Sequence, residues 1–124
     1  MSTPENTPID CAQLLVDEPM LPLPDVAERL NIPVTKVHDL IHTNKLVACR
    51  VDGVNMIPEA LLDGDELSKF VAGAITVLRD GGYEPDEILH FLFTPDDTLP
   101  GRPVDALHGH GAREVIRRAQ AMAF

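Results

Sequence analysis

The side chains best suited to bind another molecule are cations and imidazoles that gather in two short stretches of the chain. Residues 29–58 carry four Lys or Arg against two acids, and residues 98–124 carry four Arg against two acids. The rest of the chain is strongly acidic, so the formal net charge is −10. Clustered ammonium and guanidinium groups bind phosphates or carboxylates. Because salt limits electrostatic reach to about 8 Å, these local clusters decide what is bound more than the total charge does.

Chemistry of other kinds has little support in the sequence. Ser2 and Ser68 are the only serines, and no arrangement of nucleophile, base and acid stands out. The run His108-Gly109-His110 has no cysteine or carboxylate at ligand spacing, so no metal site is expected. Neither a phosphate-binding Gly-rich loop nor a dinucleotide fingerprint is present. The sequence therefore predicts a protein that is not an enzyme and holds no cofactor.

Length and composition are those of a small globular protein. The 124 residues are 44% hydrophobic and 24% charged, and folding should bury about two-thirds of the surface of such a chain. No apolar run approaches the roughly 20 residues of a membrane span, and residues 1–10 lack the features of a secretion signal. Cys11 and Cys49 do not form a disulfide framework. We expect a cytoplasmic protein that does not enter membranes.

Two short helices are predicted in the first basic stretch. Residues 24–30 fit a helix with Pro24 in its first turn, and residues 33–43 fit a second helix after a turn at residues 31–33. Apolar residues in the second helix recur at helical spacing, which directs one face inward. The residues expected to point inward are Val34, Val37, Leu40 and Ile41, and those expected to point outward are Thr35, Lys36, His38, Asp39 and His42.

A β-hairpin is predicted directly after these helices. Residues 46–51 and 54–57 alternate as strands, and Asp52-Gly53 between them favours a two-residue turn. Helix, turn, helix and hairpin in this order are typical of a winged helix-turn-helix, whose second helix enters the major groove of DNA while the hairpin reaches a flanking groove. The side chains expected to contact DNA are Thr35, Lys36, His38, His42, Lys45 and Arg50.

Two observations keep a second interpretation open. Asp39 on the outer face would meet phosphates unless it accepts a hydrogen bond from a cytosine amino group. Helix pairs with a hairpin also occur in proteins that do not bind DNA, which leaves an interaction scaffold as the alternative. If the chain binds DNA, three to four phosphate contacts predict a salt-sensitive interaction. The logarithm of the DNA-binding constant should then fall with the logarithm of the salt concentration, with a slope of about −3.

Helices are also predicted over most of the remaining chain. We expect a helix over residues 8–16 capped by Thr7, and a helical turn over residues 58–62. The clearest amphipathic helix spans residues 66–80, and Gly81-Gly82 ends it. Its inward residues are Leu67, Phe70, Val71, Ala74, Ile75 and Leu78. Further helices are expected at residues 85–93, 104–107 and 112–122, the last with Val115, Ile116, Ala119 and Met122 inward.

These elements divide the chain into four parts. We expect a disordered tail over residues 1–8, a winged helix-turn-helix domain over residues 9–62, a linking long helix within residues 63–83 and a helical C-terminal module over residues 84–124. The predicted fold class is mainly α, with a small β-hairpin wing and a helical C-terminal module.

Sequence motifs in both halves resemble known families. Residues 23–62 resemble excisionase and MerR-type winged helices through Val26-Ala27-Glu28-Arg29-Leu30, Leu46-Val47-Ala48 and Ile57-Pro58. Nearly the whole chain after the tail resembles a family of small actinobacterial winged-helix DNA-binding proteins. Its most specific segments here are residues 78–83, 91–96, 102–108 and 112–122. The resemblance implies a transcription-regulator-like DNA binder whose N-terminal tail is phosphorylated by a membrane Ser/Thr protein kinase.

Two threonines in the tail are candidates for that modification. Thr3 and Thr7 each precede a proline in the acidic first segment. A phosphate adds about −1.5 to −2 charges, which would repel DNA from a weakly basic winged helix. The hypothesis is that phosphorylation of Thr3 or Thr7 weakens DNA binding, and the alternative is an inert tail.

The C-terminal module has a resemblance of its own. Phe93-Thr94-Pro95, Leu99, Gly101, Pro103, Leu107 and Val115 are similar to the toxin-binding domain of Xre-type antitoxins, which implies a protein partner. A module that only packs or forms a homodimer is the alternative. Arg113, Arg117 and Arg118 form a patch that could meet phosphate, an acidic partner or the acids at residues 63–66, or could simply face solvent. The favoured function is a DNA-binding regulatory protein, and a protein-interaction adaptor is the alternative.

Overall fold

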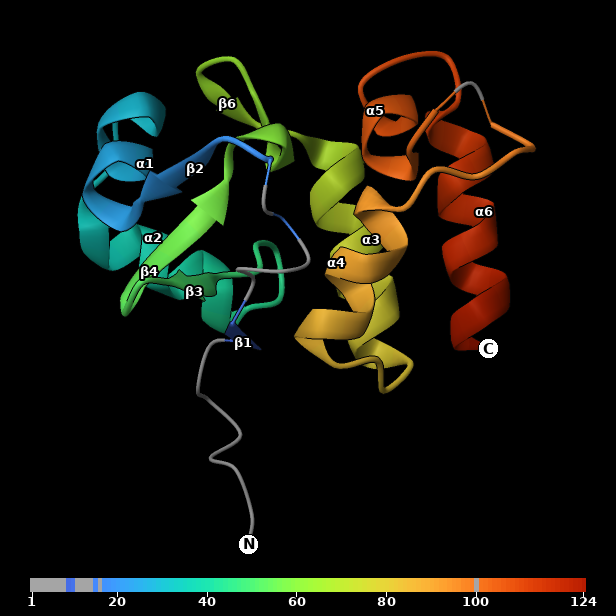
Figure 1. Cartoon of the computed structure of the whole chain (residues 1–124), viewed down its shortest axis with the longest axis horizontal. Helices are drawn as coiled ribbons and strands as arrows, with labels where there is room; N and C mark the ends of the chain where they lie inside the picture. Colours follow the sequence, from blue (N-terminus) through green and yellow to red (C-terminus); the bar gives the residue numbers. More distant parts are fainter. Residues whose placement is uncertain (1–8, 11–14, 16, 100) are drawn as a thin grey trace, which may run out of the picture.

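A computed structural model of the chain describes residues 9–10, 15, 17–99 and 101–124. It confirms a mainly helical protein that combines a winged helix-turn-helix with a helical C-terminal part. In Figure 1 the half that holds the larger sheet lies on the left, and the helical half lies on the right. The predicted tail, with Thr3 and Thr7, lies outside the described residues. Among those residues, no helix is long and apolar enough to cross a membrane.

The predicted helix pair is confirmed. Helix α1 spans Leu23–Leu30 and helix α2 spans Val34–His42. Helix α1 carries a proline in its first turn, where the missing N–H costs nothing, and ends at Asn31, whose φ of 56° is the left-handed conformation of a helix cap. Val26, Ala27 and Val37 are buried where the two helices pack together.

The hairpin that forms the wing is also confirmed. Strand β3 spans Cys49–Val51 and strand β4 spans Val54–Pro58, with Val51 opposite Val54. Asp52 and Gly53 between them have φ of 51° and 80°, as a turn of this type requires. Strand β3 is shorter than predicted, because its pairing with β4 begins only at Cys49. Residues 46–48 are buried without joining the sheet.

The N-terminal expectation is wrong where it can be checked. Ile9–Asp10 form strand β1, which runs parallel to β3, and not the start of a helix over residues 8–16. Residues 11–14 and 16 of that predicted helix lie outside the described residues. Strand β3 has a free edge whose backbone groups need partners, and β1 supplies them. Strand β2, Met20–Pro22, pairs with β4 and completes a sheet of order β1-β3-β4-β2.

The wing turn gives a stability prediction. Replacing Gly53 with alanine should destabilise the fold by about 1 kcal/mol, because a Cβ is strained at this positive φ even though nothing lies within 4 Å of it. Urea unfolding measures the change. Gly109→Ala is the matched control, because its Cβ also meets nothing within 4 Å and its φ is ordinary. Equal stability of the two variants would contradict the prediction.

Short elements connect the two halves. The helical turn predicted over residues 58–62 is confirmed by the 3-10 helix η1, Glu59–Leu61, whereas the two short strands after it were not predicted. Helix η1 leads into strands β5, Leu62–Asp63, and β6, Glu66–Leu67, which pair around Gly64. The long helix α3 therefore spans Lys69–Asp80 and not residues 66–80. It begins there because the Ser68 hydroxyl accepts a hydrogen bond from the Val71 amide.

Three further helices complete the fold and confirm the predicted positions within one or two residues. Helix α4 spans Pro85–Phe93, α5 spans Pro103–Leu107 and α6 spans Ala112–Ala123. Three residues expected inward lie near helix ends and remain exposed, because no other element fully covers them there. They are Val34, Phe70 and Met122, at 40%, 48% and 39% exposure.

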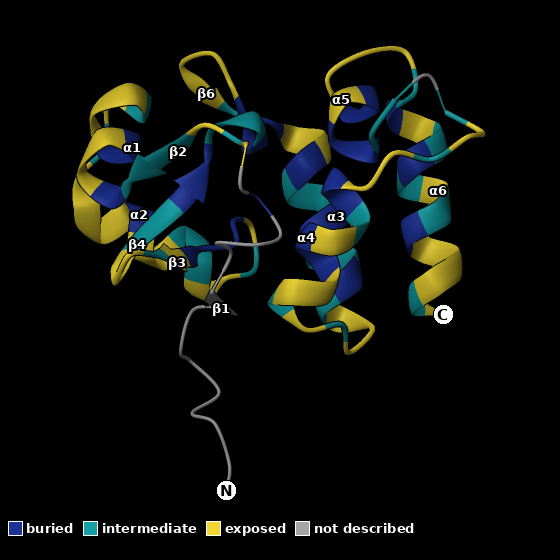
Figure 2. Cartoon of the chain, in the orientation of Figure 1, coloured by how far each residue is buried: buried dark blue, intermediate teal, exposed yellow. Residues whose placement is uncertain are grey.

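One hydrophobic core runs through both halves of the molecule. Helix α3 packs along α6, and α5 packs on η1, which joins the helical half to the winged half. Val26, Leu46 and Ile57 of the winged half belong to the same buried cluster as Leu78 and Leu92 of the helical half. Figure 2 shows buried residues on the facing sides of α3, α4 and α6 and on the sheet. We therefore expect the two halves to unfold together.

Candidate nucleic-acid interface

Helix α2 presents its polar residues to solvent as predicted. Thr35, Lys36, His38 and His42 are all exposed, while Val37 between them is fully buried. Burial of Val37 fixes the rotation of the helix, so the outer face cannot turn inward. The outer face also carries Asp39, which is exposed.

The chain just beyond α2 is fixed by a group of backbone hydrogen bonds. The amides of Lys45 and Leu46 both donate to the Leu40 carbonyl, at 2.9 and 3.2 Å. Asn44 between helix and loop has a φ of 64°, the left-handed conformation that ends many helices. Leu46 is buried, and Lys45 immediately before it is exposed. This turn holds the backbone of Lys45 beside the end of α2.

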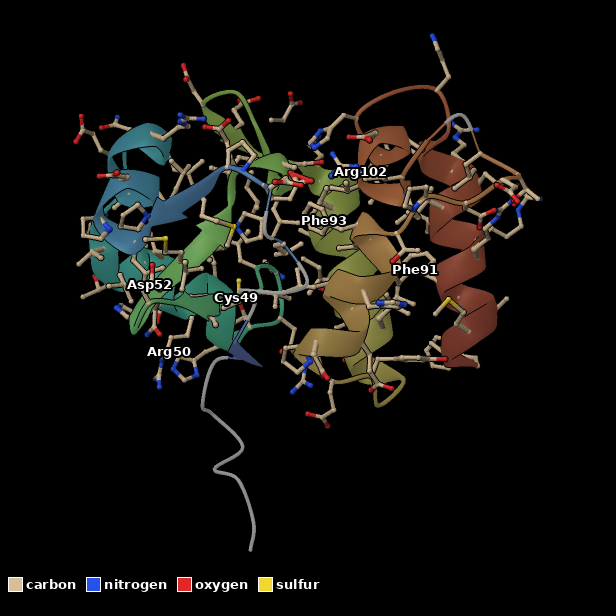
Figure 3. All side chains as sticks on the ribbon, viewed as in Figure 1. Cys49, Arg50, Asp52, Phe91, Phe93 and Arg102 are labelled. Carbon is tan, nitrogen blue, oxygen red and sulfur yellow. The ribbon has the colours of Figure 1, made fainter. Side chains whose placement is uncertain are left out.

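Arg50 lies on the wing. It follows the buried Cys49 on β3 and pairs across the hairpin with Asn55, so its side chain points away from the core. In Figure 3 Arg50 extends from the lower edge of the sheet, close to Asp52 at the wing turn. The six residues predicted to contact DNA are thus all exposed, on α2, on the loop after it and on the first strand of the wing.

Three exposed cations on α2, on the loop after it and on the wing lack an ion-pair partner among the described residues. They are Lys36, Lys45 and Arg50. Arg29 differs, because its guanidinium lies 3.2 Å from the Glu59 carboxylate. The acidic hairpin β5–β6 lies at the top of Figure 1, whereas the wing turn lies at the lower left. The face formed by Lys36, Lys45 and Arg50, called the basic face below, can therefore receive phosphates.

The C-terminal arginines are used differently. Arg118 bonds to Asp96 and Glu114, both at 3.0 Å, and Arg117 lies 3.3 Å from Glu114. Hydrogen bonds from Thr98, and then the charge of Arg118, hold the pKa of Asp96 below its usual range. Arg118 and then Arg117 do the same to the pKa of Glu114. Arg118 therefore braces a loop against α6 and does not reach the acids of residues 63–66.

Arg113 is the exception in that patch. It is exposed near the start of α6 and forms no ion pair within the described residues. Of the three arginines expected to form a patch, Arg118 is held in ion pairs, Arg117 is largely exposed beside Glu114, and Arg113 forms no ion pair within the described residues.

Two residues with clear structural roles were missed by sequence reasoning. Arg102 bonds through two nitrogens to Asp105, pairs with Glu18 and lies 5.3 Å from the centre of the Phe93 ring, as Figure 3 shows. Thr76 on α3 donates to the Asn44 carbonyl beside the basic face. The contacts of Arg102 with Glu18 and of Thr76 with Asn44 span long sequence separations, which no local pattern signals.

An open groove between α1 and the β5–β6 hairpin is unsuited to nucleic acid. It has a volume of about 690 Å³, and its charged lining is mainly acidic. The lining residues are Leu21, Asp25, Glu28, Arg29, Asn31 and Asp65. Among the described residues, no group of three His, Cys, Asp or Glu could hold a metal ion.

The helix pair, the four-stranded sheet and the wing define a winged helix-turn-helix protein. The chain belongs to the Rv2175c family. The family model "DNA-binding protein Rv2175c, wHTH domain" matches residues 7–62, and the model "Rv2175c C-terminal domain of unknown function" matches residues 69–123.

Two comparisons with individual relatives agree with this assignment. The chain is 46% identical over 121 residues to the "DNA-binding protein Rv2175c" of Mycobacterium tuberculosis, covering 87% of this chain and 83% of the relative. The structure is similar to the "NMR structure of Rv2175c", with a TM-score of 0.84 and 40% identity, covering 100% of this chain and 99% of that one.

Proposed function

We propose that the chain is a regulatory protein of the cytoplasm that binds double-stranded DNA and is not an enzyme. The observation that carries the proposal is the basic face, where three exposed cations that form no ion pair among the described residues lie on the second helix of a winged helix-turn-helix, directly after it and on the wing. The printed name of the relative from M. tuberculosis supports the same function.

Each part of the basic face has a role in this proposal. The first turns of α2 enter the major groove, where Thr35 and His38 reach base edges and Lys36 meets a phosphate. Lys45 and Arg50 neutralise phosphates on either side, with Arg50 carried by the wing. His42, in the last turn of α2, lies nearer the backbone of the duplex. Asp39 favours a cytosine in the contacted sequence, since its carboxylate can accept from the amino group.

A fluorescence-anisotropy titration with a random-sequence 25-base-pair duplex tests the proposal. Three phosphate contacts give a slope of about −2.7 for the logarithm of the binding constant against that of salt, which is roughly a 40-fold loss between 50 and 200 mM. No binding at 50 mM salt, or binding that salt does not weaken, would contradict it.

The tail regulates this binding through phosphorylation. Thr7 lies two residues before Ile9, within about 7 Å of chain length, and Ile9 and Asp10 pair with Cys49 and Arg50 on the wing. A phosphate on Thr7 would therefore carry its charge close to Arg50. Thr3 is the second candidate, four residues further along the tail, and the enzyme responsible is a Ser/Thr protein kinase.

Phosphorylation of Thr7 should weaken duplex binding roughly tenfold at 50 mM salt, which is the loss expected for one phosphate contact. Kinase-treated Thr3→Ala and Thr7→Ala variants, titrated at matched salt, separate the two positions. A phosphorylated Thr3→Ala protein that binds as tightly as the unmodified protein would rule out the role of Thr7.

A protein-interaction role of the C-terminal module is the second candidate function. It is favoured by Phe124, which is 83% exposed at the end of α6, and by the exposed Phe70 on α3. The occupant would be a second copy of the chain or a partner such as those of Xre-type antitoxins. Sedimentation of the purified chain distinguishes self-association from a requirement for another protein.

A further inference from the structure

The Thr76 side chain of the helical half forms a hydrogen bond with the backbone just beyond the end of α2. The Thr76 hydroxyl on α3 lies 2.8 Å from the Asn44 carbonyl and 2.9 Å from the Ala72 carbonyl of its own helix. A helical threonine usually bonds only to the preceding turn. Here the single proton is shared with a carbonyl that lies 32 residues away in sequence.

That carbonyl belongs to the peptide group that joins Asn44 to Lys45. The N–H of the same peptide group donates to the Leu40 carbonyl in the last turn of α2, at 2.9 Å. A residue of α2 therefore holds the N–H of this peptide group, and a residue of α3 holds its carbonyl. Since the peptide unit is planar, these two hydrogen bonds hold the Asn44–Lys45 peptide plane. The next amide, of Leu46, also donates to the Leu40 carbonyl, so the backbone on both sides of the Lys45 Cα is restrained.

Other contacts hold the helical half, which carries Thr76 on α3, against the winged half. The His108 ring nitrogen Nε2 lies 2.6 Å from the Ala60 carbonyl, which connects the end of α5 to η1. Leu61 of η1 and Leu78 of α3 are fully buried in the common core. Helix α3 therefore cannot move independently of the winged half, and Thr76 acts from a fixed position.

We infer that Thr76 is a positioning residue for DNA binding, through which the C-terminal half orients Lys45 toward a phosphate. The inference rests on the proposed function and gives the C-terminal half a part in it. Lys45 is exposed and forms no ion pair among the described residues, so the held backbone is the restraint that the structure shows on where its side chain begins.

The test compares Thr76→Val, which keeps the shape but loses the hydroxyl, with Thr76→Ser, which keeps the hydroxyl. Each full-length variant is titrated with the random-sequence 25-base-pair duplex between 50 and 200 mM salt. Thr76→Val should bind roughly tenfold more weakly at 50 mM, with a salt slope shallower by about 0.9, because one phosphate contact is lost. Thr76→Ser should restore both values.

Two further variants separate positioning from stability. Lys45→Gln should lower the salt slope equally, and adding it to Thr76→Val should cause no further loss, because both changes remove the same contact. Thr98→Val removes a hydroxyl that bonds to Asp96 in the helical half and should leave the slope unchanged.

Amide hydrogen exchange of the free protein gives a readout that does not depend on DNA. The Lys45 amide should exchange faster in Thr76→Val than in the wild type or in Thr76→Ser. If the wild-type chain binds the duplex, an unchanged Lys45 exchange rate or an unchanged salt slope in Thr76→Val would overturn this inference and leave the proposed function standing. A wild-type chain that binds no duplex would overturn the proposed function together with it.

Discussion

Replacing Lys36 and Lys45 together with glutamate should abolish retention of duplex DNA. The change removes two of the three available cations of the basic face and places two carboxylates where phosphates would lie. Loss of two phosphate contacts alone corresponds to at least ~100-fold weaker binding at 50 mM salt. Repulsion adds to that loss. Anisotropy titration with the 25-base-pair duplex measures the effect, and thermal unfolding should be nearly unchanged because both side chains are exposed.

The helical half offers a matched control. Lys69 and Arg113 are also exposed and form no ion pair within the described residues. The double change Lys69→Glu with Arg113→Glu alters the net charge by the same amount. It should weaken binding only slightly, because these cations lie away from α2 and the wing. An equal loss in both double variants would mean that net charge, and not the basic face, drives binding.

Leu61→Ala should destabilise the whole chain by roughly 2–5 kcal/mol, the range for deleting a fully buried leucine side chain. Leu61 has no exposed surface and sits on η1, where the winged half meets α5. Because one core runs through both halves, the variant should still unfold in a single transition at a lower urea concentration. Tyr83 fluorescence reports on the helical half, since it is the only tyrosine and the chain has no tryptophan.

A second probe in the winged half completes this experiment. The methyl signals of Val26, which is fully buried on α1, should disappear at the same urea concentration as the Tyr83 signal changes. Val54→Ala on the exposed start of β4 is the control and should cost less than about 0.5 kcal/mol. Two separate transitions in Leu61→Ala would show that the halves fold independently and would contradict the prediction.

The winged helix-turn-helix could be predicted because its signals are local. A proline near the start of α1, apolar residues at helical spacing and the Asp52-Gly53 turn each specify their element within a few residues. The exposure of the four candidate contact residues on α2, which are Thr35, Lys36, His38 and His42, followed from the same periodicity. Their contacts with DNA stay predictions.

The features that were not predicted depend on contacts distant in sequence, on strands too short to show a pattern, or on a cap that competes with the apolar pattern. Strand β1 exists because the edge of β3 needs partners, and strands β5 and β6 contain two residues each. No periodicity can be read in so short a strand. The start of α3 at Lys69 follows from the Ser68 cap, which competes with the apolar pattern beginning at Leu67. The contacts of Thr76 with Asn44, of Arg102 with Glu18 and of Arg118 with Asp96 likewise join residues that only folding brings near.

The two family models meet near the β5–β6 hairpin, yet the core and the polar contacts cross that boundary. Asn44 and Thr76, and likewise Ala60 and His108, lie on opposite sides of it. Recombination that joined the front half of one family member to the back half of another would separate residues that contact one another across this boundary. The two halves should therefore be inherited as one unit, and a functional chimera would need to carry the residues on both sides of the junction from a single parent.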